Sequence, residues 1–139
     1  MSTFHFYHPI EIRYGDLDPQ GHLNNAAYLT LFEQARICYL RRLGLFREGQ
    51  FFLDIGVILA DVHIAFKKPV EWGMPVRVGV HIVKIGNKSI TVEQNIVHAE
   101  TGEVFAAGEV VMVTYDYRTG RSIPVPPEWR EIIQRFEDL

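Results

Sequence analysis

One long segment with helical periodicity, followed by four segments of alternating hydrophobicity, limits the folds open to this chain. Apolar side chains recur every three or four residues over 25–43, which predicts an amphipathic helix there. Asn24 or Asn25 can cap its N-terminus, and Gly44 is suited to end it. No other segment of the sequence predicts a helix of comparable length.

Segments with a hydrophobic period of two, typical of β-strands, make up most of the remaining chain. One such segment at 4–14, which contains Pro9, precedes the helix. Four more, rich in Val and Ile, follow at 56–67, 76–85, 89–99 and 104–115. The last three are joined by short turn-like junctions, which predicts antiparallel hairpins. A short helix is expected at 128–136, where prolines precede its first turn.

Five antiparallel strands need an element to cover their apolar face, and only the helix at 25–43 is long enough. We therefore expect an α+β fold in which a five-stranded antiparallel sheet wraps around one long central helix, with a short C-terminal helix. Such a sheet has exposed edges, and pairing two sheets edge to edge in a homodimer would cover them. The 139 residues suit a single domain over 1–139.

Composition and charge exclude several classes of function. The formal net charge of −3 offers no general attraction for nucleic acid or an anionic membrane. No apolar run approaches the ~20 residues of a membrane span, and the N-terminus lacks the basic and apolar regions of a signal peptide. The single Cys38 allows no internal disulfide and suits a reducing compartment. We expect a cytoplasmic protein without nucleic-acid or membrane partners.

Several catalytic and cofactor motifs are also missing from the sequence. No serine lies in a G-x-S-x-G turn, and there is neither a P-loop nor a G-x-G-x-x-G motif. The six histidines are scattered, without the spacing or cysteine neighbours of a zinc site. Metal catalysis is therefore not expected.

Polar groups concentrate at 16–25, D-L-D-P-Q-G-H-L-N-N, immediately before the predicted helix. A helix N-terminus carries free backbone N–H groups and a partial positive charge, which would stabilise an oxyanion forming on a carbonyl held there. A carboxylate beside that point can attack the carbonyl or take a proton from water. Judged by residue types alone, the same stretch also suits an ordinary turn followed by a capping Asn.

The sequence R-Y-G-D-L-D-P-Q-G-H-L-N-N-A-A-Y-L-T-L-F-E-Q-A-R at 13–36 resembles the signature of the hydroxybenzoyl-CoA thioesterase family of hotdog proteins. It is most similar to the acyl-CoA and acyl-carrier-protein branch, and K-I-G-x-x-S at 84–89 resembles a hairpin of the same family. The resemblance implies a hotdog fold and hydrolysis of an acyl-CoA or acyl-carrier-protein thioester. It also implies a homodimer, with a homotetramer as the alternative, and no cofactor besides the coenzyme A of the substrate.

Carried over by position, the motif implies that Asp18 is the catalytic carboxylate, acting as nucleophile or general base. Asn24 and Asn25 would orient water or substrate, and His22 completes the candidate catalytic set. Asp16 would support the loop through hydrogen bonds. The candidates for binding the substrate and coenzyme A are Tyr28, Lys67, Lys68, Lys84, Lys88 and Ser89.

Each candidate binding residue can also be explained by a purely structural role. Lysine charge and a serine hydroxyl can bind phosphate, but lysines are also common on solvated sheet edges and hairpins. Tyr28 can equally serve as a packing residue of the helix. Candidates for the lining of an acyl pocket are Phe51, Phe52, Leu59 and Trp72, although apolar residues at such positions are usually part of the core.

Two other functions use the same residues. A hotdog dehydratase or hydratase acting on a hydroxyacyl thioester could employ His22 and Asp18 as an acid/base pair. A non-catalytic acyl-thioester-binding module is the more distant alternative. The D-x-D-P-x-G-H-x-N-N arrangement favours the thioesterase, and a binding module has no need of a carboxylate beside an electrophilic carbon.

Overall fold

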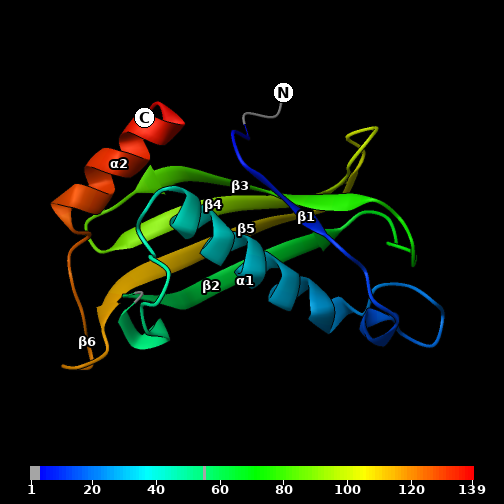
Figure 1. Ribbon diagram of the computed structural model, residues 1–139, viewed down its shortest axis with the longest axis horizontal. Coiled ribbons are helices and arrows are strands. Elements are labelled where there is room, and N and C mark those ends of the chain that lie inside the picture. Colours follow the sequence, from blue (N-terminus) through cyan, green and yellow to red (C-terminus); the bar gives the residue numbers. More distant parts are fainter. Residues whose placement is uncertain (1–3, 55) are drawn as a thin grey trace.

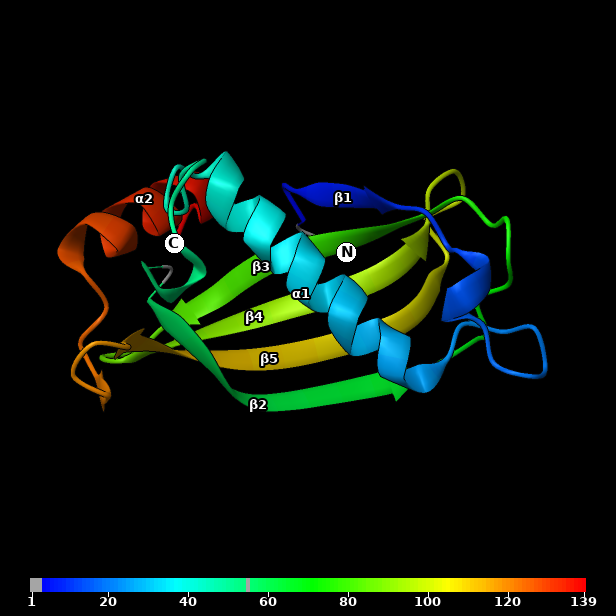
Figure 2. The ribbon, with the colours of Figure 1, turned by 60° about the horizontal axis from the view of Figure 1, so that its bottom comes forward.

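The computed structural model describes residues 4–54 and 56–139, and within them it contains six strands and two α-helices. Their bounds are β1 (Tyr7–Ile10), α1 (Asn25–Arg42), β2 (Val57–Phe66), β3 (Val76–Ile85), β4 (Ser89–His98), β5 (Val104–Asp116), β6 (Arg121–Ser122) and α2 (Pro127–Glu137). Two 3-10 turns, η1 (Tyr14–Asp16) and η2 (Phe52–Asp54), flank α1 along the chain. All paired strands are antiparallel, in the order β1-β3-β4-β5-β2, with β6 paired to β5. Figures 1 and 2 show α1 crossing one face of this sheet.

The predicted antiparallel sheet is confirmed, with two corrections. The first strand covers only Tyr7–Ile10 instead of 4–14, and it lies at the edge of the sheet, where Pro9 can be accommodated without an amide hydrogen. The sheet also contains a sixth strand, β6, that the sequence did not predict. A two-residue strand is too short to produce a hydrophobic period.

The long helix begins and ends close to its predicted limits. The side-chain oxygen of Asn24 accepts a hydrogen bond from the backbone N–H of Ala26 at 2.9 Å, so Asn24 is the N-cap. The helix ends at Arg42, one residue before the predicted end, and Gly44 follows with a φ of 78°. Neither helix of the described residues combines the length and the apolar character needed to cross a bilayer.

The buried face of α1 lies against the sheet because a glycine gives it room. A Cβ atom added to Gly108 on β5 would lie 2.4 Å from the Cε2 atom of Phe32 on α1. Phe32 is fully buried, as are Val78, Ile82, Ile90 and Ile96 of the sheet. This close approach positions the N-terminus of α1 next to the end of β2 (Figure 2).

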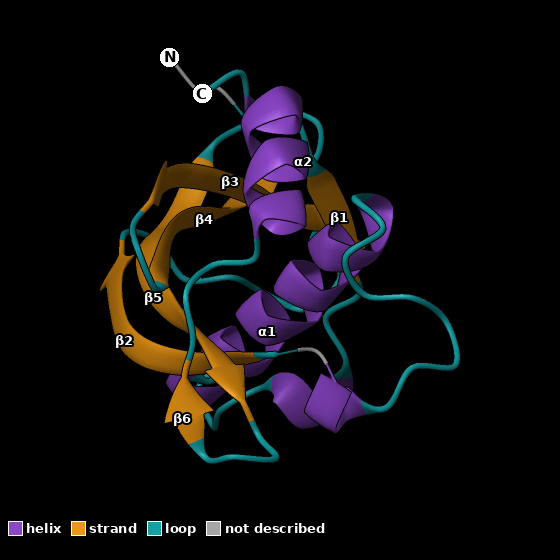
Figure 3. Ribbon diagram, turned by 90° about the vertical axis from the view of Figure 1, so that its left-hand side faces the viewer, coloured by secondary structure: helices purple, strands orange, loops and turns teal. Residues whose placement is uncertain are grey.

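The edge of the sheet formed by β3 is covered by two elements. β1 pairs with β3 only from Val76 to Gly79. Beyond that, α2 lies beside the edge (Figure 3), and the Oε2 atom of Glu137 accepts a hydrogen bond from the backbone N–H of Ile82 at 3.2 Å. A terminal nitrogen of Arg130 donates to the carbonyl oxygen of Gly86 at 2.8 Å. α2 therefore satisfies backbone groups that the short β1 leaves unpaired.

The opposite edge, β2, is not covered by any other element within residues 4–54 and 56–139. This ten-residue strand pairs with β5 on one side only. Four of its large apolar side chains are exposed: Ile58 by 40%, Leu59 by 45%, Val62 by 36% and Phe66 by 50%. A long apolar edge strand is a surface that proteins normally cover with another element or another chain.

Candidate functional site

The loop between η1 and α1 folds back on itself and brings Asp18 to the start of the helix. The backbone N–H of Asp18 donates to the carbonyl oxygen of His22 at 2.8 Å, and that of Gly21 donates to the carbonyl oxygen of Asp18 at 3.0 Å. Gly21 has a φ of 80°, a conformation that glycine adopts without strain. The backbone N–H of Leu23 donates to the carbonyl oxygen of Val70 at 2.7 Å, which ties the loop to the junction after β2.

The two carboxylate oxygens of Asp18 have different surroundings. Oδ1 accepts hydrogen bonds from the backbone N–H groups of Gln20 at 3.0 Å and His22 at 3.1 Å. Oδ2 accepts no hydrogen bond from the part of the chain that the structure describes. One oxygen thus fixes the orientation of the carboxylate, and the other is available to a ligand.

Asp16, two residues earlier, is engaged on both oxygens. Its Oδ2 accepts from the backbone N–H of Arg13 at 2.9 Å, and its Oδ1 lies 3.1 Å from a terminal guanidinium nitrogen of the same residue. Hydrogen bonding to the Arg13 side chain lowers the pKa of Asp16. The carbonyl oxygen of Asp16 also accepts from the backbone N–H of Asn24 at 2.8 Å. These contacts agree with the predicted loop-supporting role.

A groove of about 240 Å³ opens beside Asp18. It is lined by the loop and first turn of α1 on one side and by the end of β2 with the residues that follow on the other: Asp18, His22, Leu23, Asn25, Tyr28, Phe66, Lys67, Lys68 and Pro69. Six of the predicted site residues are in this group. Asn24 is not among them, since its side chain caps the helix.

Tyr28 is buried beneath the groove and stays protonated. Its ring lies edge-on to that of Phe66, with 4.9 Å between the centroids. Burial raises the pKa of Tyr28, and the nearby charge of Asp18 raises it further. A hydroxyl that keeps its proton at neutral pH can donate a hydrogen bond to an oxygen atom in the groove.

The first turn of α1 supplies a hydrogen-bond donor to the same region. The first N–H groups of a helix have no acceptor one full turn earlier in the helix. Here the N–H of Ala26 donates to Oδ1 of Asn24 and that of Ala27 to the carbonyl oxygen of Asn24, each at 2.9 Å, which leaves the N–H of Asn25 without an acceptor in the part of the chain that the structure describes. Asn25, the first residue of α1, lines the groove. An anionic oxygen would be stabilised there by this donor and by the helix dipole.

The two lysines at the groove differ in their pairing. The ammonium group of Lys68 lies 2.5 Å from Oε2 of Glu103, so its charge is partly compensated. Lys67 is exposed and forms no ion pair within residues 4–54 and 56–139. Lys67 is therefore the better candidate for a phosphate contact at this end of the sheet.

The other three predicted binding residues lie at the far end of the sheet within one chain. Phe66, which lines the groove, is aligned through Ala106 and Ile96 with Val78, so β3 begins at the groove end of the sheet. From there β3 runs about 30 Å to the hairpin that carries Lys84, Lys88 and Ser89. No side chain of that hairpin lines the groove.

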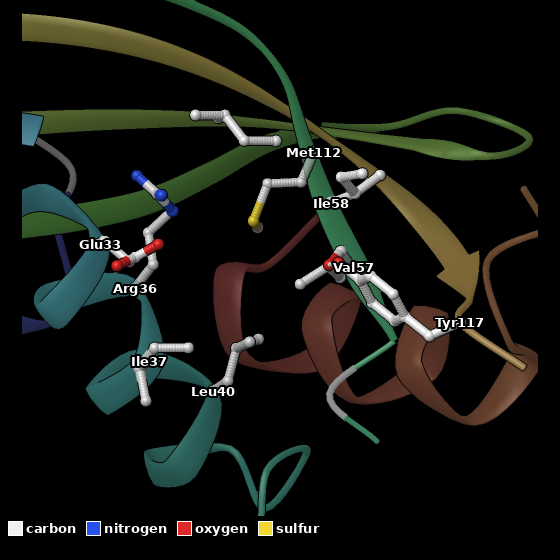
Figure 4. A pocket seen from close by; sticks show the side chains of 9 residues that line it. Glu33, Arg36, Ile37, Leu40, Val57, Ile58, Met112 and Tyr117 are labelled. Atoms are coloured by element: carbon white, nitrogen blue, oxygen red, sulfur yellow. Dashed lines mark hydrogen bonds between the residues drawn. The ribbon is translucent and has the colours of Figure 1, made fainter. Parts of the chain in front are cut away.

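A second, larger hollow of about 380 Å³ lies between α1 and the strands β2 and β5 (Figure 4). Its walls are mostly apolar and consist of Glu33, Arg36, Ile37, Leu40, Val57, Ile58, Leu59, Met112 and Tyr117. Of the residues predicted for an acyl pocket, only Leu59 is found here. Phe51 and Trp72 are largely exposed and line neither hollow, and the side chain of Phe52 lies outside the described part of the chain.

Arg36 is the buried charged residue of this cavity. One of its terminal nitrogens donates to Oε1 of Gln94 at 2.9 Å, and the amide nitrogen of Gln94 donates to the carbonyl oxygen of Phe32 at 2.9 Å. Burial lowers the pKa of Arg36, and the nearby carboxylate of Glu33 opposes this change. The sequence signal for this pair is an Arg in the buried stripe of the helix and a Gln at a buried strand position, and the hydrophobic pattern alone does not single it out.

Among the residues that the structure describes, no three His, Cys, Asp or Glu side chains form a group that could hold a metal ion. The expectation that the chemistry needs no metal or redox cofactor stays a prediction.

Comparison with known proteins identifies the family to which this fold and loop belong. The family model of the Thioesterase-like superfamily matches residues 12–133. The long-chain acyl-CoA thioesterase FadM of Escherichia coli (strain K12) is 25% identical over 127 residues, which cover 91% of this chain and 96% of FadM.

Two solved structures are similar over almost their whole length. A thioesterase from Thermus thermophilus, crystallised in complex with coenzyme A and Zn, is 32% identical with a TM-score of 0.86, covering 100% of this chain and 99% of that one. A predicted thioesterase from Bacillus stearothermophilus is 28% identical with a TM-score of 0.83, covering 94% and 95%. The family match includes the Asp18 loop, α1 and every strand from β2 to β6, and it begins just after β1. This chain therefore belongs to the Thioesterase-like superfamily.

Proposed function

We propose that this protein hydrolyses an acyl-CoA thioester to the free acid and coenzyme A in the groove that holds Asp18. The observation that carries the proposal is the Asp18 carboxylate, with one oxygen fixed by two backbone N–H groups and the other unbonded, beside the first turn of α1. Membership of the superfamily supports thioester hydrolysis, and the names of FadM and the Thermus protein support acyl-CoA as the substrate. An acyl-carrier-protein thioester is the alternative substrate.

The reaction follows from the positions of these groups. The thioester carbonyl lies over the start of α1, with its oxygen toward the free N–H group of Asn25. The unbonded oxygen of Asp18 then attacks the carbonyl carbon and the C–S bond breaks, which releases the thiolate and leaves a mixed anhydride that water hydrolyses. Alternatively, the same oxygen takes a proton from a water molecule, which attacks the carbonyl carbon and displaces the thiolate. Tyr28 and Asn25, which line the same groove, would orient the water or the substrate.

A homodimer through β2 would complete the coenzyme A site. Antiparallel pairing of two β2 strands about a two-fold axis brings the Val57 end of one strand beside the Phe66 end of the other. Within one chain, Val57 pairs with Thr114 and Ser89 pairs with Val113, so the hairpin with Lys84, Lys88 and Ser89 is at the Val57 end. The hairpin of a second copy would thus lie at the same end of the joined sheet as the Asp18 groove and Lys67.

The apolar, unpaired edge of β2 supports this dimer, and the covered edge at β3 makes that side unsuitable. We infer the hotdog arrangement, in which the sheet wraps around α1, and the contact of Phe32 with Gly108 supports it. A homotetramer, the cytoplasmic location and the absence of nucleic-acid and membrane partners stay predictions from the sequence.

Thiol release from a panel of acyl-CoA substrates by the purified protein tests this function. A thioesterase releases coenzyme A in proportion to the free acid formed. Conversion of a hydroxyacyl-CoA to the unsaturated product without thiol release would instead establish the dehydratase. Binding of acyl-CoA with neither reaction would establish a binding module.

A further inference from the structure

One guanidinium group of this fold is buried without an opposite charge. Arg36 is only 7% exposed, and among residues 4–54 and 56–139 it is the one buried residue with a positive charge. It forms no ion pair with any side chain in these two ranges. A buried charge without an opposite charge is costly, and burial accordingly lowers the pKa of Arg36.

The buried carboxylate of the chain shows the contrast. Glu137 accepts hydrogen bonds from the hydroxyl of Tyr39 and the backbone N–H of Ile82, and it lies within 3.3 Å of two histidine rings. Arg36 has only the neutral side-chain amide of Gln94 as an acceptor. Its other two guanidinium nitrogens donate to no acceptor in the described part of the chain, and neither is fully enclosed by protein atoms. These N–H groups are therefore available to a ligand.

The unbonded side of the guanidinium faces the larger cavity. Arg36 lines that cavity of about 380 Å³, and Figure 4 shows its side chain extending from α1 toward the strands. Glu33, the other charged residue of the wall, is exposed and does not pair with Arg36, so water screens its charge. The remaining wall is mainly apolar: Ile37, Leu40, Val57, Ile58, Leu59 and Met112.

We propose that this cavity is a carboxylate-binding site, in which the guanidinium of Arg36 binds the carboxylate of an aliphatic acid. A guanidinium presents parallel N–H groups that match the two oxygens of a carboxylate. The apolar wall suits the hydrocarbon part of such an acid, whereas a phosphate ester would bring further polar groups against it. The opposite charge of the ligand would compensate the buried positive charge of Arg36.

Two sources can supply such a carboxylate. One is a free carboxylic acid, the class of compound that thioester hydrolysis forms. The other is the acyl-CoA of a dicarboxylic acid, whose second carboxylate is at the end remote from the thioester. From Asn25, which lines the Asp18 groove, to Arg36 the helix rises about 16 Å, so the two sites are separate.

The first experiment measures the binding of octanoate and of its neutral analogue octanamide by calorimetry. The wild type should bind octanoate at least about 30-fold more tightly than octanamide. Arg36→Gln should lose this preference, because the new amide can still donate to Gln94 but carries no charge. Arg36→Lys, which keeps the charge, should retain part of the preference. Because this measurement needs no turnover, it remains decisive if the proposed thioesterase activity fails.

The matched control is Arg41→Met, since Arg41 is an exposed arginine of the same helix and does not line the cavity. It should leave the preference for octanoate unchanged. Leu59→Trp fills the cavity without altering a charge and should abolish octanoate binding, so it serves if Arg36→Gln does not fold. A purely structural role of Arg36 would change the stability of the protein but not its preference for the carboxylate.

The second experiment distinguishes the two sources by comparing kcat/KM for hexadecanedioyl-CoA and hexadecanoyl-CoA. A preference of about 10-fold or more for the dicarboxylic substrate that disappears in Arg36→Gln identifies the dicarboxylic acyl group as the source. A preference for octanoate alone identifies a free acid. If no acyl-CoA is hydrolysed, calorimetric binding of the same two compounds replaces the kinetic comparison. The site is overturned if the wild type shows neither preference, or if Arg36→Gln retains whichever preference the wild type shows.

Discussion

The hydroxyl oxygen of Tyr39 lies 2.6 Å from Oε2 of Glu137, so the second half of α1 is joined directly to the last residue of α2. Oε1 of the same carboxylate lies 2.9 Å from Nδ1 of His81 and 3.3 Å from Nδ1 of His5. The Glu137 side chain is fully buried. Burial and the hydrogen bond to Glu137 raise the pKa of Tyr39, which keeps the phenol a donor. One carboxylate thus connects α1, the edge of β3, the N-terminal segment and α2.

Glu137→Ala should lower the free energy of unfolding by about 3–5 kcal/mol, since it leaves several buried donors without an acceptor. Urea denaturation of the two proteins at neutral pH measures this difference. The control is Glu131→Ala on the same helix, whose ion pair with Arg135 is exposed, and it should cost less than about 0.5 kcal/mol. Equal stability of the two variants would mean that the buried carboxylate does not hold α2.

The hydrogen bonds of Asp16 to Arg13 predict a stability change in acid. Because the pKa of Asp16 is lower in the folded protein than in the unfolded chain, its contribution is complete above the unfolded value of about 3.9. The contribution disappears as the pH falls through the folded value. The stability difference between wild type and Asp16→Asn should therefore shrink as the pH is lowered below about 4, in urea denaturation across a pH series. A difference that is independent of pH would contradict the assigned ion pair.

Replacing Lys84 and Lys88 together by Ala should raise KM for acyl-CoA by about tenfold and leave kcat nearly unchanged, because contacts to phosphate act on binding. The increase should diminish at high salt, which screens exposed charges. Arg135→Gln on α2 removes an exposed charge elsewhere and should not affect KM. A loss of kcat at constant KM would show that the hairpin acts in the chemistry instead.

The sequence predicted the long helix and the loop before it better than it predicted the space around them. The helical stripe before Gly44 and the Asn24 cap are local features, so α1 was placed within one residue of its observed end. The Asp18 loop could be recognised because its turn residues and the helix start are adjacent in sequence. Lys84, Lys88 and Ser89 could not be placed, since only strand direction and register reveal that they are at the other end of the sheet.

The larger cavity was missed for a different physical reason. It forms where α1 faces β2 and β5, and these three elements are far apart in the sequence, so no local pattern predicts that they meet. The hydrogen-bonded pair Arg36 and Gln94 is likewise separated by 58 residues. The lengths of β1 and β6 likewise depend on tertiary contacts. Pro9 was noted as a break in the first strand, but its pairing ends after Ile10 because the partner of Ile10, Val76, is the first residue of β3.

Asp18→Asn is the decisive test of the proposed chemistry. A carboxamide has nearly the same shape as a carboxylate, and its oxygen can still accept the hydrogen bonds from Gln20 and His22, so the fold should be retained. It is neither an adequate nucleophile nor a base at neutral pH. Thiol release should therefore fall by about 100-fold or more in kcat, with little change in KM.

Asp16→Asn is the matched control, because the two residues share one loop and the same side-chain change. It should lose stability through Arg13 while retaining most of kcat. If Asp18 were only a turn residue, both variants would show similar and mild effects on turnover. If Asp16→Asn abolished turnover and Asp18→Asn did not, the catalytic carboxylate would be Asp16. Near-normal turnover in both would remove the reaction from this loop, because no other carboxylate lines the groove beside the first turn of α1 in the described part of the chain.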